Sequence, residues 1–69
     1  MEGKILTKRE QEIFELLVLN KTTKEIAKKL KISEKTVRNH ISNTMQKLGV
    51  KGRCSAIIEL LKLKAISLD

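Results

Sequence analysis

The 69-residue sequence contains no proline, no tryptophan and no tyrosine, and it has a single phenylalanine, Phe14, and a single cysteine, Cys54. One cysteine excludes an internal disulfide, and an unpaired thiol is typical of a reducing compartment. The lone His40 and Cys54 cannot form a zinc site, so we expect no metal and no other cofactor. Sequence-specific RNA modules stack bases on exposed aromatic side chains, and the shortage of aromatics disfavours that function.

Long apolar runs are also missing. The longest, residues 16–19, is far shorter than the run of about 20 residues that crosses a bilayer. The first residues do not form a secretory signal. We therefore expect a cytoplasmic protein without membrane contact. The sequence offers no nucleophile beside a base and no glycine-rich phosphate loop, which argues against an enzyme.

Positive charge is concentrated in one part of the chain. The formal net charge is +7, and residues 21–53 hold ten Lys and Arg but only two Glu. The flanking segments are close to neutral. This distribution predicts a polyanionic partner that docks on the middle segment. The alternative interpretation is that surface lysines only solvate a small helical protein, but solvation alone would spread the charge more evenly.

Local signals predict four helices with short connections, and hence an all-α fold. A Thr followed three residues later by Glu, at 7–10 and at 22–25, is a capping box that opens a helix. Asn20 ends the first helix, because Asn tolerates the left-handed conformation. Ser33 caps the third helix and Gly49 ends it.

The connection between the second and third helices is short, and the third helix is the longer of the two. This arrangement is a helix-turn-helix, here at about 22–48. A fourth helix follows at about 53–64. The sequence thus predicts one compact four-helix domain, residues 1–69, with a helix-turn-helix at its centre.

The third helix has two different sides when residues are placed about 100° apart. The core side holds Val37, Ile41, Thr44 and Leu48. The opposite side holds hydrogen-bond donors, namely Lys35, Arg38, Asn39, Ser42 and Gln46. Arg can bind guanine and Asn can bind adenine, each through two hydrogen bonds. The only acid on this helix is Glu34 in the first turn, where the helix dipole favours it. The pattern predicts base recognition rather than a plain solvated face.

The fourth helix carries more apolar surface than one small core can cover. One stripe, Ala56, Leu60 and Leu63, is expected to face the core. A second set is expected to form a homodimer interface, and it comprises Cys54, Ile57, Ile58 and Leu61. A two-fold dimer closes such a self-complementary patch most simply. The alternative is that the C-terminal tail, residues 66–68, folds back over this set.

Four segments resemble the LuxR-type helix-turn-helix family of bacterial transcription regulators. They are LTKRE (6–10), KEIA (24–27), ISEKTVRNHI (32–41) and KLGV (47–50), in unbroken order. The resemblance covers nearly the whole chain and implies a sequence-specific DNA-binding transcription regulator. Two departures are Thr44, where many members have a large aliphatic residue, and Asn20, where many have Gly.

Within that family, residues 21–27 and 32–53 most resemble a stand-alone regulator of late sporulation and spore-coat genes. Most family members attach this domain to a receiver or ligand-binding domain, for which this sequence has no room. The closer resemblance implies a role in sporulation. A protein-interaction module that uses the fold without binding DNA is the alternative, and the charge distribution argues against it.

The resemblance also implies partners and site residues. The partners are double-stranded DNA with a pseudo-palindromic operator, a second copy of the chain and, as a further candidate, RNA polymerase. The positions that contact bases in the major groove are Arg38, Asn39 and Ser42. The positions that contact phosphates are Thr23, Lys24, Lys35, Thr36 and Lys47.

Overall fold

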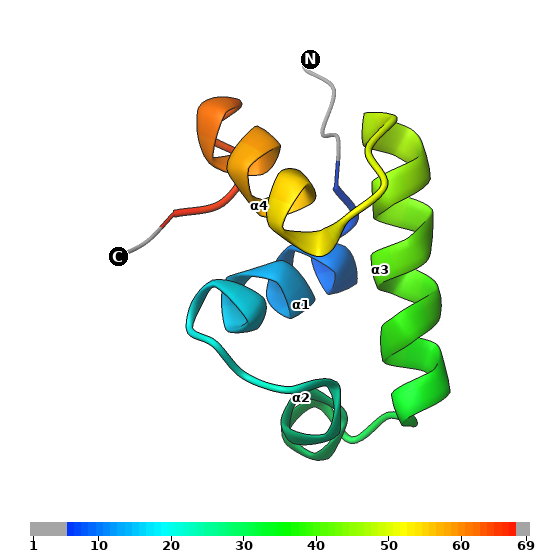
Figure 1. The fold of residues 1–69 in the computed structure, drawn as a ribbon. Helices are drawn as coiled ribbons and strands as arrows, with labels where there is room; N and C mark the ends of the chain where they lie inside the picture. The colour runs from blue at the N-terminus through cyan, green and yellow to red at the C-terminus, as the bar shows by residue number, and fades with distance from the viewer. Residues whose placement is uncertain (1–5, 68–69) are drawn as a thin grey trace.

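A computed structural model describes residues 6–67, and this part of the chain contains four helices and no strand. They are α1 (Lys8–Val18), α2 (Thr23–Leu30), α3 (Glu34–Leu48) and α4 (Arg53–Lys62). The helix α3 runs along one side of the molecule, α1 and α4 pack against it, and α2 lies beside its N-terminal end (Figure 1). The expected all-α helix-turn-helix fold is confirmed.

The helix starts lie where the capping signals predict them. The Thr7 hydroxyl accepts from the Glu10 amide at 3.2 Å, and the Glu10 carboxylate accepts from the Thr7 amide at 3.0 Å. Thr22 and Glu25 form the same reciprocal pair at 3.1 and 2.8 Å. In α3 the Ser33 hydroxyl accepts from a backbone amide three residues on, at 3.0 Å. These bonds satisfy amides that the first turn of a helix leaves without partners.

Each helix contributes one face to the core. The largest fully buried side chains are Phe14, Ile13, Ile26, Leu60, Val37 and Thr44. The hydroxyl of Thr44 donates to the His40 carbonyl at 2.9 Å, so this polar group is satisfied inside the core. The departure from the aliphatic residue of many family members therefore leaves no unpaired polar atom there.

The end of α4 differs from the prediction. Leu63 was expected in the core, but it is 47% exposed, because α4 ends at Lys62 and Leu63 is its C-cap. Lys64 then takes a left-handed φ of 58°, and the chain turns so that Ile66 enters the core. Ile58 stays 53% exposed, so the described part of the tail does not cover it. Leu68 lies outside the described residues.

Two other residues with a Cβ take the left-handed region. Asn20 follows α1 with a φ of 68°, as expected, and Lys31 is the C-cap of α2 with φ 60° and ψ 43°. A residue with a Cβ is strained in this conformation, whereas Gly is not. Lys31 thus stores strain in the turn between the two helices of the helix-turn-helix.

Replacing Lys31 by Gly should raise the free energy of unfolding by about 0.5–1 kcal/mol, because the relief of strain exceeds the entropy that Gly adds to the unfolded chain. Urea denaturation measures the change. The matched control is Lys29→Gly inside α2, which should lower stability by about 1 kcal/mol. Equal losses in both variants would show that Lys31 is not strained.

Candidate nucleic-acid interface

The outward side of α3 brings the predicted base-contacting residues together. Arg38, Asn39 and Ser42 are exposed. Val37, Ile41 and Thr44 are buried and fix the opposite side of the helix in the core. Since positions four apart on a helix lie one above the other, Arg38 and Ser42 share a face. The result is a row of hydrogen-bond donors on a rigid element.

Four of the five predicted phosphate-contacting residues lie at the N-terminal ends of α2 and α3, and the fifth, Lys47, lies in the last turn of α3. Thr23 is half-buried and Lys24 is exposed in the first turn of α2, and Lys35 is exposed in the first turn of α3. The hydroxyl of Thr36 lies 2.9 Å from that of Ser33. Both helix ends present backbone amides and the positive end of a helix dipole, which favour anions.

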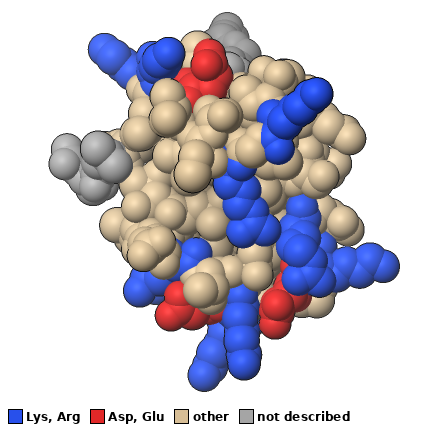
Figure 2. Space-filling view, viewed as in Figure 1, with Lys and Arg blue, Asp and Glu red and all other residues tan. Residues whose placement is uncertain are grey.

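Most lysine and arginine side chains of the face shown in Figure 2 lie in its middle, right and lower parts, and others lie at the upper left, over the end of α4. Their distribution matches the sequence, in which the positive charge is concentrated in residues 21–53. Contacts between α2 and α3 hold these two helices together. The positive side chains of α2 and α3 therefore belong to one continuous surface.

Lys47 takes part in the fold as well as in the predicted interface. Its Nζ lies 2.6 Å from Oε1 of Glu10, and the side chains of Lys47 and Glu10 are 40% and 4% exposed. The same Oε1 accepts the Thr7 amide that closes the capping box of α1. One carboxylate oxygen thus joins the start of α1 to the last turn of α3. The sequence does not indicate this pair, because the capping box already explains a Glu at position 10 and Lys47 lies 37 positions away.

The surroundings of Glu10 change the pKa of its carboxyl group. Burial acts to raise that pKa, but the hydrogen bond from Lys47, the hydrogen bond from the Thr7 amide and the nearby positive charges together lower it below the ordinary 4.5. Glu10 is therefore ionised at neutral pH and holds Lys47 by a charge-assisted hydrogen bond.

Arg38 has an acidic neighbour. Its Nη1 lies 3.6 Å from Oε1 of Glu34, one turn earlier on the same helix, and the two side chains are 54% and 45% exposed. An exposed pair of this kind contributes little to stability. The pair matters for the predicted interface, because Arg38 is one of the predicted base-contacting residues.

The second apolar set of α4 lies on the side away from its buried residues Ala56 and Leu60. Cys54 and Ile58 are exposed, whereas Ile57 and Leu61 are half-buried. The described chain thus leaves part of this surface open to solvent.

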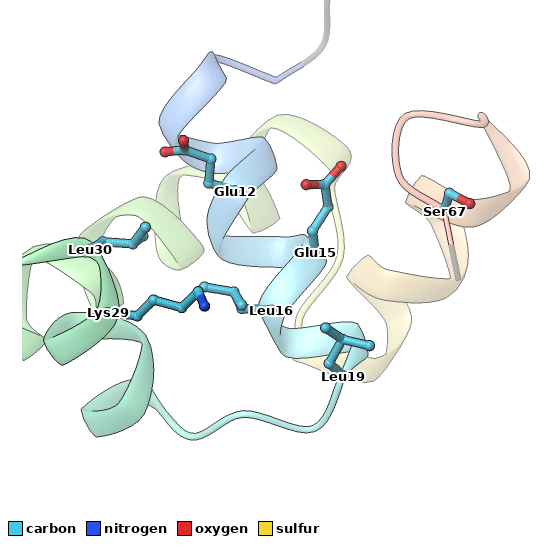
Figure 3. A pocket seen from close by; sticks show the side chains of 7 residues that line it. All are labelled: Glu12, Glu15, Leu16, Leu19, Lys29, Leu30 and Ser67. Atoms are coloured by element: carbon cyan, nitrogen blue, oxygen red, sulfur yellow. The ribbon is translucent and has the colours of Figure 1, made fainter. Parts of the chain in front are cut away.

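A separate hollow lies between α1, α2 and the C-terminal segment (Figure 3). It is lined by Glu12, Glu15, Leu16, Leu19, Lys29, Leu30 and Ser67. Its two carboxylates repel phosphate, so we do not assign DNA to it. Within residues 6–67, no group of three His, Cys, Asp or Glu could hold a metal ion. None of the four helices described is long and apolar enough to cross a membrane.

Known proteins are similar to this chain over most of its length. The family model for bacterial regulatory proteins, luxR family, matches residues 4–60. Spore germination protein GerE of Bacillus subtilis (strain 168) is 70% identical over 64 residues, which are 93% of this chain and 86% of GerE. The solved structure of the transcription factor GerE covers 97% of this chain and 100% of its own, with a TM-score of 0.94 and 66% identity.

Longer regulators match as well. Transcriptional regulatory protein DegU of Brevibacillus brevis is 45% identical over 58 residues, which are 84% of this chain but 25% of DegU. DesR of Bacillus subtilis (strain 168) is 52% identical over 56 residues, which are 81% of this chain and 28% of DesR. The predicted resemblance to the LuxR-type family, and to a sporulation regulator within it, is confirmed.

The ion pair of Glu10 should make stability depend on pH. Because the pKa of Glu10 is lower in the folded than in the unfolded chain, its contribution is present above the unfolded value and is lost as the pH falls through the folded value. Glu10→Gln should cost about 1–3 kcal/mol at neutral pH and reduce the loss of stability on acidification.

Urea denaturation from about pH 7 to about pH 3 measures both effects. The matched control is Glu15→Gln, since Glu15 is an exposed residue of the same helix. If Glu10→Gln and the wild type lost stability in parallel as the pH fell, the Lys47 pair would not be the cause.

Proposed function

Because the chain belongs to the luxR family of bacterial regulatory proteins and is a GerE-like transcription regulator, we propose that it binds a pseudo-palindromic site in double-stranded DNA as a homodimer. The observation that carries this proposal is the outward side of α3, on which Arg38, Asn39 and Ser42 are exposed opposite a buried stripe. The second helix of a helix-turn-helix lies in the major groove.

Base recognition is assigned to these three residues. Arg38 donates two hydrogen bonds to O6 and N7 of guanine, and Asn39 pairs with N6 and N7 of adenine. Ser42 lies one turn beyond Arg38, and its hydroxyl can donate or accept. Residues in the first half of the recognition helix reach base edges, which fits Arg38 and Asn39 in particular.

Phosphate contacts position the domain on the duplex. We assign them to residues at the helix starts and at the last turn of α3, namely Thr23, Lys24, Lys35, Thr36 and Lys47. The exposure of Lys24 and Lys35 supports their assignment. Lys47 also holds Glu10, so its replacement would disturb the fold together with DNA binding.

The homodimer is assigned to the second apolar set of α4, Cys54, Ile57, Ile58 and Leu61. The 53% exposure of Ile58 supports this assignment, because burying an exposed apolar side chain in an interface lowers the free energy. A two-fold dimer would present two recognition helices to half-sites about one helical turn apart. The 69 residues then act as one domain with two surfaces, α3 for DNA and α4 for the second copy.

The similarity to GerE supports a role in sporulation. We propose that the regulated genes are late sporulation genes, among them genes of the spore coat. The protein acts in the cytoplasm on the chromosome, without a catalytic step, and RNA polymerase is the further partner. Loss of spore-coat transcripts on deletion of the gene would test this role.

Sequence readout and phosphate contact can be separated with two variants. Arg38→Ala should cost about 1–3 kcal/mol on the preferred site and little on random duplex, because it removes a base contact. Lys35→Ala should weaken binding to both and reduce the salt dependence of log K by about one unit. Fluorescence anisotropy at several salt concentrations measures both. If Arg38→Ala weakened both duplexes equally, Arg38 would be a phosphate contact.

The dimer assignment is tested by Ile58→Glu. A buried carboxylate would separate the two copies, so sedimentation should show a folded monomer, and affinity for the two-half-site DNA should fall at least about a hundredfold. Leu19→Glu is the matched control, since Leu19 is also an exposed apolar residue, at 59%, but is the C-cap of α1 and not part of the proposed interface. A folded Ile58→Glu variant with unchanged mass and affinity would place the interface elsewhere.

A further inference from the structure

The acid in the first turn of α3 is used differently from those of α1 and α2. In α1 and α2 it is the third residue, Glu10 or Glu25, and its carboxylate accepts the amide of the N-cap residue. In α3 the acid is the first residue, Glu34, and the third residue is Thr36, whose hydroxyl pairs with that of Ser33. The carboxylate of Glu34 instead lies 3.6 Å from the guanidinium of Arg38.

This carboxylate stands on the surface assigned to DNA. A negative charge beside the phosphates is unfavourable in every complex, whatever the base sequence, because binding depends on neutralising phosphates. A favourable contact at a particular sequence can offset that cost. In the major groove a carboxylate finds its donor in an exocyclic amino group, that of cytosine N4 above all.

We propose that Glu34 is a specificity-determining residue. Its carboxylate holds the guanidinium of Arg38 toward the base edges, and it accepts a hydrogen bond from N4 of a cytosine beside the guanine that Arg38 reads. The guanidinium of Arg38 and the carboxylate of Glu34 lie 3.6 Å apart. Successive bases of one strand are about 3.4 Å apart, so the two groups can reach neighbouring base pairs. The inference rests on the proposed entry of α3 into the major groove.

The pair acts in two ways. Because guanidinium is planar with donors in a fixed fork, one edge held by a carboxylate leaves the other edge oriented for guanine. The same carboxylate disfavours complexes in which Arg38 turns to a phosphate. Glu34 therefore lowers affinity for random DNA and contributes to affinity for the preferred site.

The test compares the wild type with Glu34→Gln, Glu34→Asp and the matched control Glu15→Gln, which removes the same charge from α1. Binding sites are selected from randomised duplex DNA, and affinities for the selected site and for random duplex are measured at one salt concentration. Glu34→Gln should bind random duplex a few-fold more tightly. Its ratio of specific to random affinity should fall about tenfold, with loss of the cytosine preference at one position.

Glu34→Asp separates recognition from helix stability. Asp keeps the charge at the helix start, which the dipole favours, but its shorter side chain no longer reaches Arg38 and the base. It should therefore keep the thermal stability of the wild type and still lose the cytosine preference. Glu15→Gln should keep both the preference and the ratio.

Two results would overturn the inference. One is a Glu34→Gln variant that selects the same site with the same ratio as Glu15→Gln, and the other is a Glu34→Asp variant that behaves as the wild type. A wild type without any base preference would overturn the proposed function and the inference with it. That failure is distinguishable, because it is seen before any variant is made.

Discussion

A single carboxylate adds a directional contact to the apolar packing that holds α3 in place. Apolar packing of Val37, Ile41 and Thr44 holds the helix against the core, but such packing is not directional. A small domain buries only about 60% of the surface of its unfolded chain, so each directional contact matters. Oε1 of Glu10 accepts both the Thr7 amide and the ammonium of Lys47. It thereby ties the last turn of α3 to the start of α1, while the buried stripe of α3 determines which side of the helix faces solvent.

Much of the fold could be predicted because its signals are local. The capping residues act within three positions of each helix start, and α1, α2 and α3 begin where those signals lie. Helical periodicity likewise predicts which side of α3 is buried. The prediction failed at Leu63, because periodicity assumes that the helix continues. Instead α4 ends at Lys62 and the chain turns so that Ile66 is buried, a tertiary contact that periodicity does not predict.

The site was predictable to a lesser degree. The exposure of Arg38, Asn39 and Ser42 follows from periodicity, whereas the base-contacting role proposed for them rests on the family resemblance. The link between Glu10 and Lys47 spans 37 positions, and a single sequence carries no signal for it. The spacing of Glu34 and Arg38 was visible, but the helix dipole already explained an acid at that place. Because the dipole was a sufficient reason for Glu34, its contact with Arg38 was not predicted.

The contact between Glu10 and Lys47 joins distant parts of the chain and affects how the domain folds. It closes a loop of the chain that contains α2 and nearly all of α3. Closing this loop costs conformational entropy, and the contact offsets that cost only once it has formed. The core under α3 also needs Leu60 and Ile66 from the end of the chain. A nascent chain that ends at α3 already contains Glu10 and Lys47 but lacks these two core side chains, so its core is incomplete. We therefore expect α3 to be held in place only after the residues up to Ile66 have been added, when the small core can form in one cooperative step.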